Sequence, residues 1–148
     1  MKRIVIGADG SPPANRATDI GLELAASTGA QVVFVHFSAL AEELFQEDPQ
    51  NGPSQQRIEE ADPVLHQAAE AARARGVPAE LKLQYERGTT KIAAELAGFA
   101  EGLDADMIVV GNRSRSEVAE VVLGSVSHEL LRISPVAVVV VHAVEQKA

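Results

Sequence analysis

The stretch MIVVGNRSRSEVAEVVLGSVS, residues 107–127, decides the fold class of this chain. It begins with the apolar run Met107–Val110, which has the composition of a buried strand. Gly111 follows, then a segment of small residues and arginines, and then Gly124–Ser127 at the start of a helical pattern. Backbone N–H groups and the positive end of the helix dipole face a ligand at such a helix start. The stretch therefore predicts a strand–loop–helix unit suited to an anion, most often a phosphate.

The composition indicates one globular domain over residues 1–148. Hydrophobic residues make up 46% of the chain and aromatic residues only 3%, so the core must be built from Val, Ile, Leu and Ala. The formal net charge of −8 argues against non-specific nucleic-acid binding. The absence of cysteine excludes disulfides, thiolate zinc sites and cysteine nucleophiles. The first apolar run spans only about six residues, too few for a signal peptide or a membrane span. We therefore expect a cytoplasmic protein without membrane contact.

Five apolar runs predict strands, and helical patterns lie between them. Four of the runs are nearly continuous Val and Ile, which is typical of strands covered on both faces. The third alternates, with Leu81, Leu83 and Tyr85 on one face, and this pattern indicates an edge strand. The alternation of strands and helices predicts an α/β fold with a parallel sheet and right-handed crossovers. The strands are expected at Arg3–Ala8, Gln31–Ser38, Ala79–Glu86, Met107–Val110 and Val136–His142.

Two helices have recognisable ends. Ser11 can cap the first helix, with Pro12 at its first position and Gly29 as its terminator. The second helix is expected as one element from about Gln55 to Arg75, with Gly76 as its terminator.

Two segments lack such patterns. Residues 39–56 carry Gln, Glu, Pro, Asn and Gly with little periodicity, and are expected to form a variable loop after the second strand. Residues 145–148 are expected to be a frayed tail.

Ligands of doubly wound sheets bind beyond the carboxyl ends of the strands, where the strand order reverses. The loops after the first and fourth strands, ADGSPP and GNRSRS, have unusual compositions. Asp9 comes directly after the first strand and Gly111 directly after the fourth. These two loops are the candidate site.

These residues resemble the universal stress protein family over the whole length of the chain. The resemblance rests on the opening IVIGADGS, on VVFVHF in the second strand, on DADMIVVGNRS and on the closing LGSVSHELLRISPVAVVVV. It implies a five-stranded parallel sheet of order 3-2-1-4-5 with helices on both faces, a Rossmann-like fold similar to that of adenine nucleotide α-hydrolases. The order puts the reversal between strands one and four, and strand five at an edge.

Many members of that family bind ATP through the pattern Gly, two residues, Gly, nine residues, Gly, then Ser or Thr. In this chain Gly111, Gly124 and Ser125 match, and the spacing is intact, but Ser114 stands at the second glycine. If that backbone needs a positive φ, a non-glycine residue costs roughly 1–2 kcal/mol. Alternatively, Ser114 and Glu117 form a capping-box pattern, in which Ser114 only starts a helical turn. The chain thus lies between the nucleotide-binding and the non-binding branches, nearer the binding one.

The resemblance also implies roles for individual residues in binding ATP, with Mg²⁺ or Mn²⁺ as its counterion. Asp9 would contact the ribose or base, the backbone at Ala8 and Phe37 would meet the adenine, and Gly111 would let the backbone approach the ligand. The remaining binding residues, which would surround the phosphates, are Arg113, Ser114, Gly124, Ser125, Val126 and Ser127. For Asp9 the alternative is a turn residue, and for Ser125 a plain N-cap. No protein side chain is assigned to a metal, and no pair of histidines has convincing metal spacing.

Three functions follow as hypotheses. The first is a stress-response regulator that signals through ATP occupancy. The second is a nucleotide-free dimeric adaptor, which Ser114 in place of glycine favours. The third, an enzyme of the related α-hydrolase architecture, ranks last because DGSPP replaces the SGG-type loop of those enzymes, and no general base is evident. No catalytic residue is assigned, although weak ATP hydrolysis stays open.

The last strand predicts self-association. Its run VAVVVV is long, apolar and expected at a sheet edge, and an uncovered edge of that kind invites pairing. Family members resemble one another in dimerising through this strand, antiparallel. We expect a homodimer with an interface of Val136, Val138, Val139, Val140 and Val141.

His36, in the second strand, is expected to be packed or hydrogen-bonded rather than catalytic.

Overall fold

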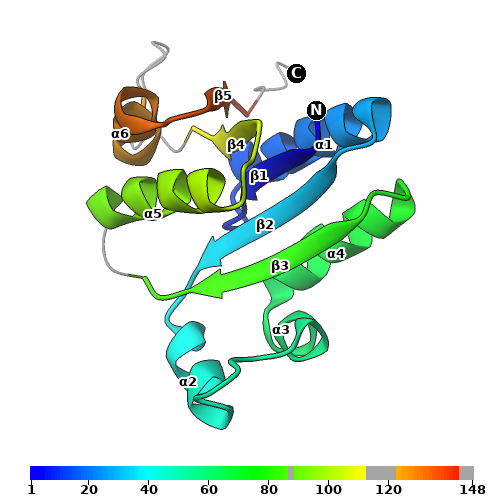
Figure 1. Ribbon diagram of the computed structural model, residues 1–148, viewed down its shortest axis with the longest axis vertical. Helices are drawn as coiled ribbons and strands as arrows, with labels where there is room; N and C mark the ends of the chain where they lie inside the picture. Colours follow the sequence, from blue (N-terminus) through cyan, green and yellow to red (C-terminus); the bar gives the residue numbers. More distant parts are fainter. Residues whose placement is uncertain (87–88, 113–122, 144–148) are drawn as a thin grey trace, which may run out of the picture.

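The computed structural model describes residues 1–86, 89–112 and 123–143. Its centre is a five-stranded parallel sheet in the order β3-β2-β1-β4-β5, which confirms the predicted fold class and strand order (Figure 1). Strands β1 and β4, which are not consecutive in the chain, lie side by side in the sheet, and the strand order reverses between them. The strands are β1 (Arg3–Gly7), β2 (Gln31–Phe37), β3 (Ala79–Gln84), β4 (Met107–Gly111) and β5 (Ala137–Val141).

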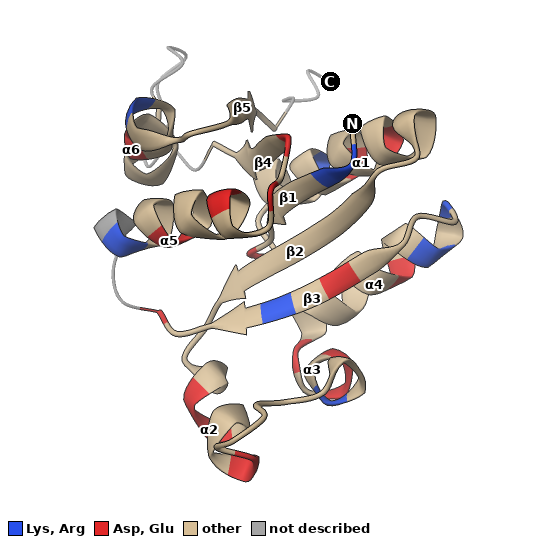
Figure 2. Ribbon diagram, viewed as in Figure 1, with Lys and Arg blue, Asp and Glu red and all other residues tan. Residues whose placement is uncertain are grey.

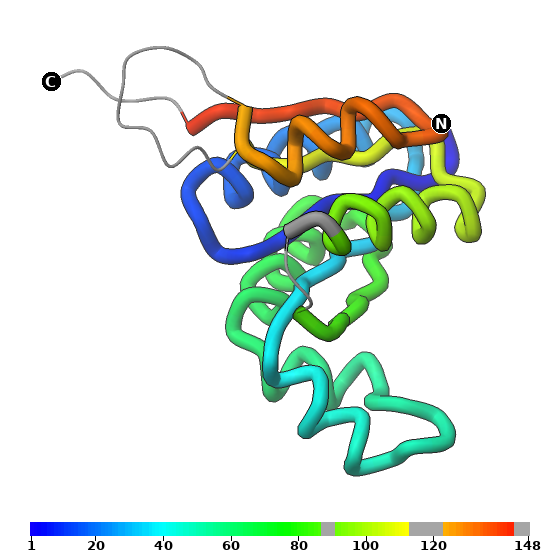
Figure 3. The backbone as a smooth tube through the Cα atoms, turned by 90° about the vertical axis from the view of Figure 1, so that its left-hand side faces the viewer, coloured from blue at the N-terminus to red at the C-terminus, as the bar shows by residue number. Residues whose placement is uncertain are grey.

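Helices cover both faces of the sheet, because successive side chains of each strand point to opposite faces. Ile4 and Ile6 of β1 join the core under α1 and α4, whereas Val5 joins the core under α5 and α6. Seen from the side, α2 and α3 extend beyond the sheet at the β3 side (Figure 3). The helices are α1 (Pro12–Thr28), α2 (Leu40–Glu47), α3 (Gln55–Ala61), α4 (Pro63–Ala74), α5 (Thr89–Gly102) and α6 (Ser125–Ile133).

The ends of α1 are as predicted. Ser11 is its N-cap and accepts a hydrogen bond from Ala14 N, with Pro12 at the first helical position. Gly29 ends the helix at φ 77°, a left-handed conformation that favours glycine. Among the described helices, none is both long and apolar enough to cross a membrane.

The segment 39–56 is not the irregular loop that its composition suggested. It contains α2, whose Ala41 and Leu44 are buried in the core. Phe45 stacks on Tyr85 beyond the end of β3, with ring centroids 5.5 Å apart. Only two of its eight residues are buried, so the sequence shows little helical periodicity. Packing against the core, and not the local pattern, stabilises this helix.

The single helix expected from Gln55 to Arg75 is wrong, because the chain breaks into α3 and α4 at Asp62. The residue before a proline is disfavoured in helical conformation, and Asp62, which precedes Pro63, is extended at φ −111° and ψ 107°. Its side chain then caps α4, accepting from Leu65 N at 3.0 Å. The apolar positions of both helices continue in register, which hid the break.

The two sheet edges differ in chemistry. Charges of both signs lie along β3, where Glu80 and Lys82 approach to 3.8 Å, and none lie along β5 (Figure 2). Gln55 also covers the β3 edge, since its side-chain amide bonds both Leu81 N and Leu81 O at 2.7 and 2.8 Å. Charge and a covering group are both devices that keep an edge strand from pairing. Within the described chain, β5 has the apolar edge.

Candidate functional site

The candidate site lies at the carboxyl ends of β1 and β4, where the strand order reverses. Ala8 and Asp9 continue β1, and Gly111 ends β4 beside them in the sheet. The helix start of α6 returns to the same end, because Gly124 bonds to Asn112 directly after β4. The sheet therefore brings together the two loops that the sequence marked as unusual.

The loop after β1 is a tight turn held by its own side chains. Asp9 Oδ1 accepts a hydrogen bond from Ser11 N at 2.8 Å, and Gly10 takes a φ of 81°. Asp9 is exposed at the sheet end. Asp9 is thus a turn residue, as the alternative interpretation of the sequence held. Because its side chain is exposed, it is also accessible to a ligand.

Ala8 and Phe37, assigned by resemblance to the adenine, end neighbouring strands. Ala8 is buried and its N–H donates to Val35 O at 2.9 Å, so only its carbonyl is available to a ligand. Phe37 is half-buried and packs against the core on the α5 side.

Gly111 is required by packing against α1. A Cβ atom at this position would lie 2.3 Å from Ala14 N and 2.4 Å from the carbonyl carbon of Pro13. Contacts this short to backbone cannot be relieved by a side-chain rotation. The missing side chain therefore lets the end of β4 meet the start of α1, whether or not a ligand is bound.

Asn112 is the site residue that the sequence reasoning missed. It is buried, its N–H donates to Val141 O at 2.8 Å, and its Oδ1 accepts from Gly124 N at 2.6 Å. Its Nδ2 lies 3.4 Å from His142 Nδ1. Asn112 therefore joins β4, β5 and the start of α6. The signal in the sequence was a polar amide placed directly after a buried strand.

The start of α6 has no cap from any described side chain. Gly124 is the N-cap, at φ −66° and ψ 160°, so the alternative in which Ser125 is the N-cap is wrong. Ser125 is exposed, Val126 half-buried and Ser127 buried. The amides of a first helical turn lack partners within the helix and carry the positive end of its dipole. This arrangement can bind an anion.

A buried hydrogen-bonded pair supports the site from the α4 side. His36 Nδ1 lies 2.7 Å from Asp62 Oδ2, and Asp62 is 1% exposed, which confirms that His36 is hydrogen-bonded. Burial raises the pKa of Asp62, but hydrogen bonds from His36 and from the Leu65 amide outweigh it and lower the pKa below its ordinary value. A Cβ atom on Gly10 would lie 3.2 Å from Val64 Cγ2, so the start of α4 backs the β1 loop.

The predicted phosphate residues fall into two groups. Gly111, Gly124, Ser125, Val126 and Ser127 lie at the carboxyl end of β4 and the start of α6. Arg113 and Ser114 lie outside the described residues, as does the capping-box alternative for Ser114.

The predicted interface valines lie on and next to the edge strand β5. Val138 and Val140 pack toward the core under α5 and α6, and Val139 and Val141 toward the core under α1. Val136 precedes the strand, which begins at Ala137. Val138 and Val140 therefore share one face of the strand, and both are partly buried.

Comparisons with known proteins agree with this geometry. The model of the universal stress protein family matches residues 1–142. The chain is 32% identical to a Thermus aquaticus protein described as a universal stress protein in the QAH/OAS sulfhydrylase 3′ region, covering 95% of this chain and 98% of the relative. A universal stress protein crystallised in complex with cAMP is 26% identical, with a TM-score of 0.68 and coverage of 97% and 98%. One from Archaeoglobus fulgidus in complex with dAMP is 23% identical, with a TM-score of 0.66 and coverage of 95% and 98%, and shows the shared fold.

Proposed function

Since this chain belongs to the universal stress protein family, we propose that it is a cytoplasmic stress-response regulator that binds ATP and acts as a homodimer. The observation that carries the nucleotide proposal is the start of α6, which no described side chain caps and which Asn112 joins to the end of β4 at the reversal point of the sheet. The cAMP complex of the relative at 26% identity supports an adenine nucleotide as the class of ligand.

The phosphates are assigned to the start of α6. Backbone amides of Ser125, Val126 and Ser127 can donate there without a basic side chain. The chain carries a net charge of −8, which opposes the approach of a polyanion. We therefore assign Mg²⁺ or Mn²⁺ to the phosphates, since such an ion is commonly bound through substrate phosphates with few protein ligands.

The nucleoside is assigned to the ends of β1 and β2. Asp9 is exposed beside the turn, and a carboxylate accepts hydrogen bonds from ribose hydroxyls. The carbonyl of Ala8 and the strand end at Phe37 are assigned to the adenine. These groups recognise the ligand mainly through backbone atoms, so the signal is occupancy of the site rather than chemistry performed in it.

Equilibrium titration of the protein with ATP and Mg²⁺ tests this function directly. We expect saturable binding of one nucleotide per chain below millimolar concentration. Absence of binding at millimolar ATP would reject the proposal in favour of a nucleotide-free adaptor, the function that Ser114 favours.

The Asp9→Asn variant is expected to bind ATP about tenfold more weakly, because hydrogen bonds to a charged group are worth about 1.5–3 kcal/mol. An asparagine oxygen can still accept from Ser11 N, so the turn is preserved. Calorimetric titration measures the affinity of both proteins. Asp19→Asn removes the same charge at an exposed position of α1 and is the matched control. It should leave the affinity for ATP unchanged. Equal affinities of Asp9→Asn and the parent protein would remove Asp9 from the site.

The homodimer is assigned to the open edge of β5. Val141 O accepts from Asn112 N, so the backbone groups of Ala137, Val139 and Val141 face β4. By alternation, the N–H and C=O groups of Val138 and Val140 face the edge. The contrast with β3, where charges and Gln55 cover the edge, supports β5 as the pairing strand.

The Val140→Pro variant is expected to be a monomer, since proline removes an N–H that faces the edge and spares the ladder to β4. Light scattering at micromolar concentration should give twice the monomer mass of 15.6 kDa for the parent protein and the monomer mass for the variant. Val140→Ala trims the side chain but keeps the N–H, and should stay dimeric. A dimeric Val140→Pro, or a monomeric parent protein, would contradict the assignment.

A further inference from the structure

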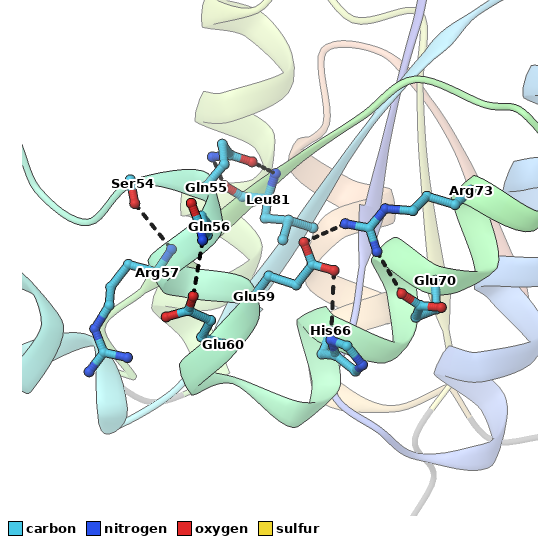
Figure 4. Close-up of polar contacts among 10 residues, drawn as sticks. All are labelled: Ser54, Gln55, Gln56, Arg57, Glu59, Glu60, His66, Glu70, Arg73 and Leu81. Atoms are coloured by element: carbon cyan, nitrogen blue, oxygen red, sulfur yellow. Dashed lines mark hydrogen bonds and ion pairs between the residues drawn. The ribbon is translucent and has the colours of Figure 1, made fainter.

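Three metal-ligating side chains meet on the outer surface of α3 and α4, outside the nucleotide site. Glu59 comes from α3, and His66 and Glu70 come from α4 (Figure 4). One ligand atom from each lies within 4.8 Å of the others. Glu59 is the most covered of the three, with 20% of its side chain exposed, against 56% for His66 and 60% for Glu70.

The fold holds this cluster in place through the break at Asp62. His66 and Glu70 are four residues apart, so both project from one face of α4. The turn at Asp62 folds α3 back toward that face and brings Glu59 against it, with Glu59 Oε1 3.6 Å from His66 Nδ1. Asp62 is itself bonded to His36 and to the Leu65 amide, so two hydrogen bonds hold the turn. In the single long helix predicted from the sequence, Glu59 and His66 would share a face but lie two turns apart, about 10 Å along the helix axis.

The donor set fits a first-row divalent cation. One imidazole nitrogen and two carboxylates are typical ligands of Zn²⁺ and its neighbours, which bind imidazole better than Mg²⁺ or Ca²⁺ do. An open groove of about 490 Å³ adjoins the cluster and is lined by Gln56, Glu59, Glu60, Pro63 and His66. It leaves room for water or another ligand on the metal.

We propose that Glu59, His66 and Glu70 form a binding site for a first-row divalent cation, with Zn²⁺ as the ion of choice. The site is independent of ATP, because none of its residues belongs to the loops at the reversal point. The acidic surface around it, which includes Glu60, favours a cation over an anion.

Arg73 is the built-in competitor for this ion. Its guanidinium bonds Glu59 Oε2 at 2.5 Å and Glu70 Oε1 at 2.7 Å, so it bridges the two carboxylates (Figure 4). Exposed ion pairs of this kind are weak, and a divalent ion bound by three ligands can displace them. Zn²⁺ and Arg73 therefore exchange at the same carboxylates.

Calorimetric titration of nucleotide-free, full-length protein with Zn²⁺ tests the site. We expect one Zn²⁺ ion per chain in the parent protein. In His66→Ala and in Glu70→Gln the affinity for Zn²⁺ should be lower by at least about tenfold, because each variant loses one ligand of the metal. His128→Ala removes the same kind of side chain at an exposed position of α6 and is the control. It should bind Zn²⁺ like the parent protein. Arg73→Gln should bind Zn²⁺ about two- to fivefold more tightly, the gain set by exposed ion pairs.

The outcomes separate a built site from other binding. All the variants change exposed groups and should keep the circular dichroism and melting temperature of the parent protein. Zn²⁺ binding that is absent at millimolar concentration, or equal in His66→Ala and the parent protein, would overturn the proposal. Weaker binding in Arg73→Gln would show Arg73 as an organiser and overturn the exchange. ATP titration of His66→Ala should match the parent protein, so failure here is distinct from failure of the nucleotide site.

Discussion

Asp62→Ala is expected to lower the free energy of unfolding by about 2–4 kcal/mol, the combined loss of a charge-assisted hydrogen bond and a helix cap. Both carboxylate oxygens of Asp62 are in use, Oδ1 by the Leu65 amide at 3.0 Å and Oδ2 by His36 Nδ1 at 2.7 Å. With Asp62 buried, alanine leaves His36 without its partner and α4 without its cap. Urea unfolding measures the change.

Ser54→Ala is the matched control, because Ser54 caps α3 through Arg57 N but is exposed and has no buried partner. It should cost only about 1 kcal/mol, the typical loss of an N-cap. Equal losses in the two variants would mean that the pair with His36 contributes nothing to stability.

The same pair makes a part of the stability depend on acid. Folding lowers the pKa of Asp62 from its ordinary value of 3.8, so between the two values the unfolded chain binds more protons than the folded one. The contribution is therefore complete above the ordinary pKa and is lost as the pH falls through the lowered one. The difference in stability between the parent protein and Asp62→Ala should shrink as the pH falls below about 3.8. A difference that stays constant down to that range and below it would contradict the lowered pKa.

Gly111→Ala is expected to lower the free energy of unfolding by about 1–3 kcal/mol, the usual cost of overpacking. The added Cβ would meet Ala14 N at 2.3 Å and the Pro13 carbonyl carbon at 2.4 Å, both backbone atoms. Relief therefore requires the end of β4 to move from the start of α1, and both border the proposed nucleotide site. Thermal and urea unfolding, together with ATP titration, measure the two consequences.

Gly98→Ala provides the control, since nothing lies within 4 Å of a Cβ at this position in the middle of α5. It should raise the stability by about 0.5–1 kcal/mol, because alanine loses less conformational freedom in a helix than glycine. If Gly111→Ala were as stable as the parent protein, the end of β4 could shift without cost. The glycine would then be needed only for ligand binding and not for packing.

Local patterns carried the prediction of the sheet and of one side of the site. Four Val- and Ile-rich runs and one alternating run located the five strands to within a residue or two, and Ser11, Pro12 and Gly29 marked the ends of α1. Asp9 and Gly111 were found because a parallel sheet exposes the residues that follow its strands. The strand order came from the family resemblance, since no strand's own pattern specifies its neighbour.

Groups that act across the fold were not predictable in this way. Asn112 looks like any polar loop residue until β5 and α6 close around it. The buried side of α2 is recognisable only once Ala41 and Leu44 pack into the core, and the apolar positions of α3 and α4 continue across the break at Asp62. In each case the deciding partner is distant in sequence.

The sequence by itself determined the class of fold, the positions of the strands and the two loops at the reversal point, because periodicity and turn chemistry act between near neighbours in the chain. Only the tertiary structure decided that Gly111 serves the packing of α1, that Asn112 holds the start of α6, and that Glu59 meets His66 and Glu70. These three contacts join separate segments of the chain, and only the assembled sheet and the turn at Asp62 bring those segments together. Burial then gives such contacts their strength, because a polar group removed from water must find its partner within the protein.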